Sequence, residues 1–145
     1  MNSIKVLVSD LIDDVGISKL KKAGFTVDVE PSIDHSELKK KVPVYDALVV
    51  RSRTKVTRDI IEAAVRLKAI ARAGAGLDNI DVEAAKDRGI EVISAPGSLT
   101  TSVAELTVGL ILSVLRKIPY ADSELKQGRW AKKSLQGGLL KGKTV

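Results

Sequence analysis

The stretch Arg72-Ala-Gly-Ala-Gly-Leu-Asp-Asn-Ile-Asp81 decides the fold of this 145-residue chain. It follows an apolar run, Leu67-Lys-Ala-Ile-Ala71, which is typical of a buried strand. It leads into Asp81-Val-Glu-Ala-Ala-Lys-Asp-Arg-Gly89, where an aspartate cap and a closing glycine predict a short helix. The stretch therefore predicts a strand, a glycine-rich turn and a helix in succession.

The glycines of this turn also suggest a binding chemistry. Gly74 and Gly76 have no Cβ atom, so backbone N–H groups can approach an anion closely. Arg72, at the end of the strand, can add a charge-assisted hydrogen bond to a carboxylate or a phosphate. The same glycines could simply make the tight strand-to-helix turn that any doubly wound protein needs. The turn alone leaves both interpretations open.

Further strands and short helices alternate along residues 4–93. The segments that read as strands are Ile4–Val8, Phe25–Val29, Tyr45–Val50 and Ile90–Ile93. This alternation predicts a doubly wound parallel sheet with helices on both faces, in which ligands bind beyond the carboxyl ends of the strands. Asp10, Arg51, Arg53, Arg72 and the glycine turn all fall at that edge. Three arginines placed there by two different strands favour an anion site.

Composition excludes several classes of function. The 24 Lys+Arg and 18 Asp+Glu residues give a net charge of +6, but the basic residues are scattered and aromatics make up only 3%. We therefore expect a solvated surface and no nucleic-acid partner. The absence of cysteine excludes disulfides, thiol catalysis and cysteine-based zinc sites. The single histidine, His35, has no second histidine with which to bind a metal, so no metal is expected. The first predicted strand begins at Ile4 with no apolar segment or cleavage site before it, which favours the cytoplasm.

After Pro96 the sequence changes character. Ser102-Val-Ala-Glu105 matches a capping box, and the helix predicted after it is apolar nearly all round as far as Ile118. Such a helix requires a neighbouring domain or a second subunit to cover it, but its apolar run is too short to span a membrane. Lys141-Gly-Lys-Thr-Val145 reads as the start of a strand, so we expect the chain to be part of a larger protein.

Four segments, in order and spacing, resemble the NAD-dependent D-2-hydroxyacid dehydrogenases. They are Val50–Val56, Arg72–Asp81, Ser102–Leu106 and Gly128–Trp130. The resemblance implies that residues 1–97 form a flavodoxin-like substrate-binding domain. It implies that residues 98–145 form the long interdomain helix, a dimerisation arm and the start of a truncated NAD-binding domain. A homodimer or a higher homo-oligomer is expected.

The resemblance also assigns roles to individual residues. Arg51, Arg53 and Arg72 would contact the substrate, a small and phosphorylated 2-hydroxy or 2-oxo acid, and the backbone of Ala73, Gly74, Ala75 and Gly76 would hold its carboxylate. Ala75 would also touch the cofactor weakly, whereas the main NAD site would lie beyond Val145. The catalytic residues of the family come later in its sequences, so none is expected here and the isolated chain should be inactive.

Two positions depart from the family pattern, and one alternative function stays open. Ala75 stands where many members carry threonine, and Leu99 stands where many carry an asparagine near the substrate. A non-catalytic, flavodoxin-like module that binds a small anion or regulates a partner is the alternative. A phosphoacceptor receiver is disfavoured because Arg51, rather than an aspartate, ends the third strand. An open reading frame that continues into G-x-G-x-x-G would favour the dehydrogenase.

Overall fold

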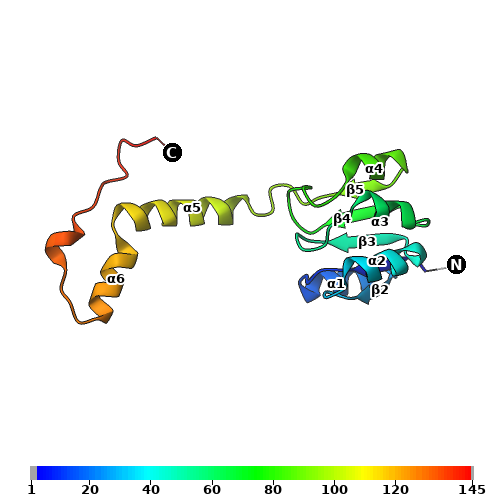
Figure 1. Ribbon diagram of the computed structural model, residues 1–145, viewed down its shortest axis with the longest axis horizontal. Helices are drawn as coiled ribbons and strands as arrows, with labels where there is room; N and C mark the ends of the chain where they lie inside the picture. The colour runs from blue at the N-terminus through cyan, green and yellow to red at the C-terminus, as the bar shows by residue number, and fades with distance from the viewer. Residues whose placement is uncertain (1–2, 145) are drawn as a thin grey trace. The chain divides into compact units, whose positions relative to one another are not determined.

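The computed structural model describes residues 3–144. The chain divides into two compact units, unit 1 (Met1–Ser98) and unit 2 (Leu99–Val145). The elements of both are labelled in Figure 1.

Unit 1 is built on a parallel five-stranded sheet. Its strands are β1 (Lys5–Val8), β2 (Thr26–Val29), β3 (Ala47–Val50), β4 (Ala69–Arg72) and β5 (Glu91–Ile93). Their order in the sheet is β2-β1-β3-β4-β5, the flavodoxin-like order of a doubly wound fold. The predicted fold class is therefore confirmed. Val50 of β3 pairs with Arg72 of β4, which brings the ends of these two strands side by side.

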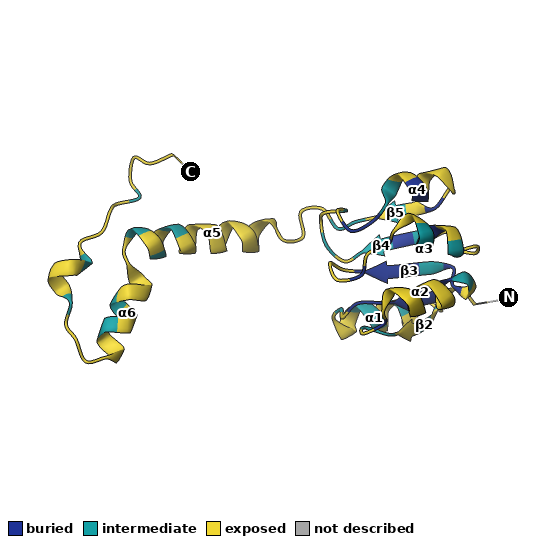
Figure 2. Ribbon diagram, viewed as in Figure 1, coloured by how far each residue is buried: buried dark blue, intermediate teal, exposed yellow. Residues whose placement is uncertain are grey.

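Helices cover both faces of this sheet, as the alternating sequence predicted. They are α1 (Asp14–Lys22), α2 (His35–Lys41), α3 (Arg58–Ala63) and α4 (Val82–Asp87). On one face Leu48 and Ile70 of the sheet belong to the same buried cluster as Leu38, Ile60 and Ala84 from the last three helices. On the other face Val6, Val8 and Val49 pack with Leu20 of α1 and with Phe25. Figure 2 shows the central strands as the buried part of the unit.

The ends of the helices follow short-range signals in the sequence. Asp81 caps α4 as predicted, since its carboxylate accepts a hydrogen bond from the amide of Ala84. Asp13 caps α1 in the same way and accepts from the amide of Val15. Thr57 stands at the N-cap of α3, but its hydroxyl contacts the carboxylate of Asp59 instead of a backbone amide.

Unit 2 consists of α5 (Thr100–Leu115), α6 (Ile118–Lys126) and a 3₁₀ turn, η2 (Lys132–Leu135). The capping box predicted at Ser102 is wrong. The helix begins at Thr100, so Ser102 has helical backbone and cannot be the extended N-cap residue. A break separates α5 from α6, where Lys117 adopts the left-handed conformation with φ of 55°.

The strand predicted at Lys141–Val145 is not formed by the part of it that the structure describes. Lys141 and Gly142 lie in a turn, Lys143 and Thr144 have no regular secondary structure, and Val145 is outside the described residues. None of the helices within residues 3–144 is long and apolar enough to cross a membrane. The interdomain and dimerisation roles expected of α5 stay predictions.

Candidate functional site

The predicted site residues of unit 1 lie at the carboxyl edge of the sheet. Ser9 and Asp10 follow β1, the loop of residues 51–54 follows β3, and Arg72 is the last residue of β4. Because all strands are parallel, their carboxyl ends meet at one edge. Residues 51–54 are called the β3 loop below, and residues 73–76 the glycine turn.

A buried carboxylate holds the β3 loop in place. Asp10 is only 2% exposed, and its Oδ2 accepts a hydrogen bond from the amide of Arg51 at 2.6 Å. The same residue accepts from the amide of Thr54 at 3.2 Å and from the Thr54 hydroxyl at 2.9 Å. A buried carboxylate is stable only when it is paired in this way. Asp10 therefore fixes the backbone from which Arg51 projects.

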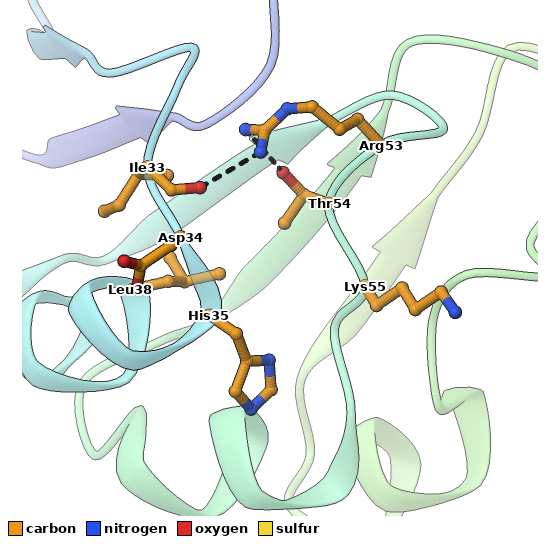
Figure 3. Close-up of a pocket in the computed structure, with 7 residues that line it drawn as sticks. All are labelled: Ile33, Asp34, His35, Leu38, Arg53, Thr54 and Lys55. Carbon is orange, nitrogen blue, oxygen red and sulfur yellow. Dashed lines mark hydrogen bonds between the residues drawn. The ribbon is translucent and has the colours of Figure 1, made fainter.

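Arg53 is anchored within unit 1. Its Nε lies 3.0 Å from Asp10 Oδ1, its Nη1 donates to the carbonyl of Ile33 at 3.0 Å, and its Nη2 donates to the carbonyl of Ser9. It also lines a pocket beside α2, in which Figure 3 shows its guanidinium turned toward Ile33 and Thr54. Most of its donors are occupied, so the structure supports an anchoring role for Arg53 more strongly than the substrate contact that was predicted.

Arg51 projects from the fixed loop with most of its guanidinium free. Its Nη1 donates to the carbonyl of Leu11 at 3.1 Å. Together with Asp10, Leu11 and Pro31 it lines a shallow pocket at the sheet edge. This is the position that the sequence predicted for a substrate-facing arginine.

The guanidinium of Arg72 lies across the glycine turn. Its side chain is 13% exposed, and its Nε donates to Asn79 Oδ1 at 3.1 Å. Arg72 Nη1 is 2.8 Å from the position that a Cβ atom would take on Gly74, and 3.5 Å from that on Gly76. The glycines are needed here because the guanidinium fills the space of their missing side chains. Within residues 3–144, the Nη groups of Arg72 form no hydrogen bond, and Asp78 Oδ1 lies 3.7 Å from Nη2.

Only part of the glycine turn can offer amides to a ligand. The amide of Ala73 donates to the carbonyl of Val50 and that of Gly74 to the carbonyl of Arg72, both at 2.8 Å. The amides of Ala75 and Gly76 have no acceptor among the described residues. Of the four predicted backbone groups, these two remain available next to the Nη groups of Arg72.

Asn79 joins the β3 loop to the glycine turn, and its role was not predicted from the sequence. It is 9% exposed, and its Nδ2 donates to the carbonyls of Arg51 at 2.7 Å and Thr54 at 2.6 Å. Its Oδ1 accepts from Arg72 Nε. In the sequence the residue looks like an ordinary turn asparagine, since nothing local shows that both ends of its amide are buried against other strands.

The remaining sequence candidates lie away from this edge or carry no contact there. His35 is the first residue of α2, and its Nε2 lies 3.1 Å from Asp59 Oδ2 in a partly exposed surface pair. Ala75 is exposed. Leu99 belongs to unit 2. No group of three or more potential metal ligands occurs within residues 3–144.

The glycine turn does not fit a dinucleotide. A pyrophosphate site needs a glycine-rich turn that opens directly onto the N-terminus of a helix. Here α4 begins only at Val82, and its first-turn amide at Ala84 is already bonded to Asp81. The described residues thus form an edge suited to a small acid, with no pyrophosphate site beside it.

The fold and the edge define an α/β domain with arginines gathered at the carboxyl ends of its parallel strands, and comparison with known proteins gives its family. Residues 6–139 match the model of the D-isomer specific 2-hydroxyacid dehydrogenase catalytic domain. The chain belongs to this family. It is 48% identical over 142 residues to a D-3-phosphoglycerate dehydrogenase of Archaeoglobus fulgidus, covering 98% of this chain and 27% of that protein.

Two other proteins extend the comparison. A hydroxypyruvate reductase of Thermotoga maritima is 48% identical over 145 residues, which are 100% of this chain and 47% of the relative. The structure of a 3-phosphoglycerate dehydrogenase of Entamoeba histolytica, solved with NAD+ bound, is 33% identical with a TM-score of 0.70, covering 80% of this chain and 40% of that one. The chain thus spans about a quarter to a half of the curated relatives named here.

Proposed function

We propose that this chain is the substrate-binding portion of an NAD-dependent D-2-hydroxyacid dehydrogenase whose substrate is 3-phosphoglycerate. The complete enzyme would oxidise it to 3-phosphohydroxypyruvate, the entry step of serine biosynthesis. The observation that carries the proposal is the Arg72 guanidinium, which lies over the glycine turn. Within residues 3–144 its Nη groups form no hydrogen bond, and the neighbouring amides of Ala75 and Gly76 have no acceptor.

In this proposal the edge binds and orients the acid. The Nη groups of Arg72 and the amides of Ala75 and Gly76 would donate to the carboxylate, and Arg51 would contribute a second positive charge. The glycine turn keeps the backbone close enough for these contacts because no Cβ atom intervenes. Holding a reactant in one orientation lowers the barrier of the later hydride transfer by removing rotational freedom beforehand.

The remaining parts of the proposal rest on family likeness and on the sequence. NAD is proposed as the cofactor by similarity to the NAD+-bound relative, and no step is assigned to it within residues 3–144. A second copy of the chain is proposed as a partner, joined through α5. A sequence without cysteines suits a reducing compartment, so the cytoplasm is the proposed location.

The proposal is tested by NMR titration of the ¹⁵N-labelled chain with 3-phosphoglycerate, D-glycerate and inorganic phosphate. We expect 3-phosphoglycerate to shift the amides of Arg51 and of residues 72–76 at millimolar concentration, with weaker effects from D-glycerate. Equal shifts with phosphate alone would favour the module that binds any small anion. A folded sample that shows no shift with any of the three ligands would overturn the proposal.

A further inference from the structure

Within residues 3–144, Asn79 is the one side chain that hydrogen-bonds both to the β3 loop and to Arg72. Its amide nitrogen donates to the carbonyls of Arg51 and Thr54, at 2.7 and 2.6 Å, and its amide oxygen accepts from Arg72 Nε at 3.1 Å. Arg51 and Thr54 lie in the β3 loop, 28 and 25 positions before Asn79 in the sequence, whereas Arg72 ends β4. One amide group therefore links the backbone that carries Arg51 to the side chain of Arg72.

The hydrogen bond to Nε decides which part of Arg72 remains available. A guanidinium has five N–H groups in a planar fork, and the Nη pair is best suited to a carboxylate. Because Asn79 engages the Nε, the Nη groups are turned over Gly74 and Gly76. Without this contact, Arg72 would be held only by the neighbouring Asp78, whose side chain is 83% exposed and lies 3.7 Å away.

Asn79 is itself held firmly. Its carbonyl accepts from the amide of Val56 at 2.8 Å, and Val56 and Ile80 form a parallel bridge. The side chain is buried, so the cost of leaving its polar atoms unpaired keeps all three hydrogen bonds formed together. An amide is suited to this place because it offers two donors and an acceptor without adding a charge next to Arg72.

We propose that Asn79 is the positioning residue of the acid site. It fixes the Arg72 guanidinium and the β3 loop in a single arrangement, so that both arginines face the same ligand. This inference rests on the proposed function, since it assigns Asn79 a part in binding the acid. Asn79 itself is not expected to touch the ligand.

The experiment is a double-mutant cycle on the 145-residue chain, with the dissociation constant for 3-phosphoglycerate measured by NMR. Asn79→Ala should weaken binding about tenfold, the usual effect of losing a hydrogen bond to a charged group. In the Arg72→Ala background, Asn79→Ala should cause a smaller further loss, about threefold, because only its effect on the β3 loop and Arg51 remains. A residue that only stabilised the fold would weaken binding equally in both backgrounds.

Two controls separate positioning from stability and from charge. Asp81→Ala, two residues away, removes the N-cap of α4 without contacting either arginine, and it should leave the dissociation constant within twofold. Arg72→Lys keeps the charge but cannot reproduce the Nε contact, and it should weaken binding nearly as much as Asn79→Ala does. If Asn79→Ala does not fold, Asn79→Asp decides the question: it keeps an acceptor for Arg72 Nε but loses the donors to the β3 loop, and it should weaken binding more in the wild-type background than in Arg72→Ala.

Each outcome bears on a different claim. A wild-type chain that binds no acid would overturn the proposed function together with this inference. A wild-type chain that binds, with unchanged affinity in Asn79→Ala or Arg72→Lys, would overturn the inference alone. Equal losses from Asn79→Ala in the two backgrounds would also overturn it.

Discussion

At the scale of single residues, the candidate site depends on contacts that join distant parts of the chain. The arginines at the strand ends could be predicted because each follows an apolar run that reads as a strand. The groups that hold them could not. Asp10 is 41 positions from the Arg51 amide that it binds, and no local pattern shows that its carboxylate is buried. The same holds for the amide of Asn79.

The first residue-scale prediction concerns Arg72. Arg72→Ala should weaken the binding of 3-phosphoglycerate by about tenfold to a hundredfold, since a hydrogen bond to a charged group contributes roughly 1.5–3 kcal/mol. NMR titration measures the effect. Arg66→Ala is the matched control, because it removes the same charge from an ion pair with Asp46. The Asp46 carboxylate accepts a hydrogen bond from the amide of Lys5, at the start of β1. An Arg72→Ala chain that binds the acid as tightly as Arg66→Ala would remove Arg72 from the site.

A second residue-scale prediction concerns Tyr45. Burial raises the pKa of Tyr45 to about 12, and the hydrogen bond that its hydroxyl donates to Asp28 Oδ2 at 2.9 Å is the second largest cause of this rise. The folded state thus holds the phenolic proton more tightly than the unfolded chain, whose tyrosine pKa is about 10. The resulting stability should be complete below pH 10 and should be lost as the pH rises toward 12.

The difference between wild type and Tyr45→Phe isolates this group. Ultraviolet titration should show a tyrosinate signal near pH 12 that is absent from Tyr45→Phe, and the unfolding free energy of the variant should fall less between pH 10 and 12. A Tyr45 signal centred at pH 10 would contradict the buried contact with Asp28.

At the scale of elements, the sequence predicts strands better than it predicts the beginnings of helices. The strands are short apolar runs under two layers of helix, and their composition alone identifies them. The start of α5 was predicted wrongly at Ser102 because the capping pattern there also suits the first turn of a helix that begins at Thr100. The close approach of Gly137 to the end of α5 gave no sequence signal at all.

Gly137 provides the element-scale prediction. A Cβ atom at this position would lie 2.3 Å from the carbonyl oxygen of Leu115, at the end of α5, and the next amide, of Gly138, donates to that oxygen at 2.9 Å. Gly137→Ala should therefore push this segment off the helix end and cost about 1–3 kcal/mol, as overpacking does elsewhere. Faster hydrogen exchange of the Gly138 amide would report the displacement.

Gly109→Ala is the control for that substitution. Gly109 lies inside α5 with no heavy atom within 4 Å of its ideal Cβ position, so alanine there should stabilise the helix by about 0.5–1 kcal/mol. Unchanged exchange at Gly138 in Gly137→Ala would show that the segment does not pack as described.

At the scale of the whole molecule, the main feature of unit 2 is apolar surface that the unit itself does not cover. Val103, Leu106, Leu110 and Val114 follow one another at spacings of three and four residues, so they share one face of α5. Their exposed fractions within the structure run from 56% to 77%. Soluble proteins rarely leave a continuous row of large apolar side chains in water.

We therefore predict that the purified chain self-associates through this face of α5. Sedimentation velocity should show dimers or larger species at micromolar concentration. The double variant Leu106→Lys and Leu110→Lys should shift the population toward monomer, because it places two like charges at the contact.

The pair Thr101→Lys and Glu105→Gln changes the net charge equally but removes no apolar side chain, and it should associate as wild type does. A wild-type chain that stays monomeric at high concentration would show that α5 does not join two copies. A dimer that survives both leucine substitutions would place the contact on another surface.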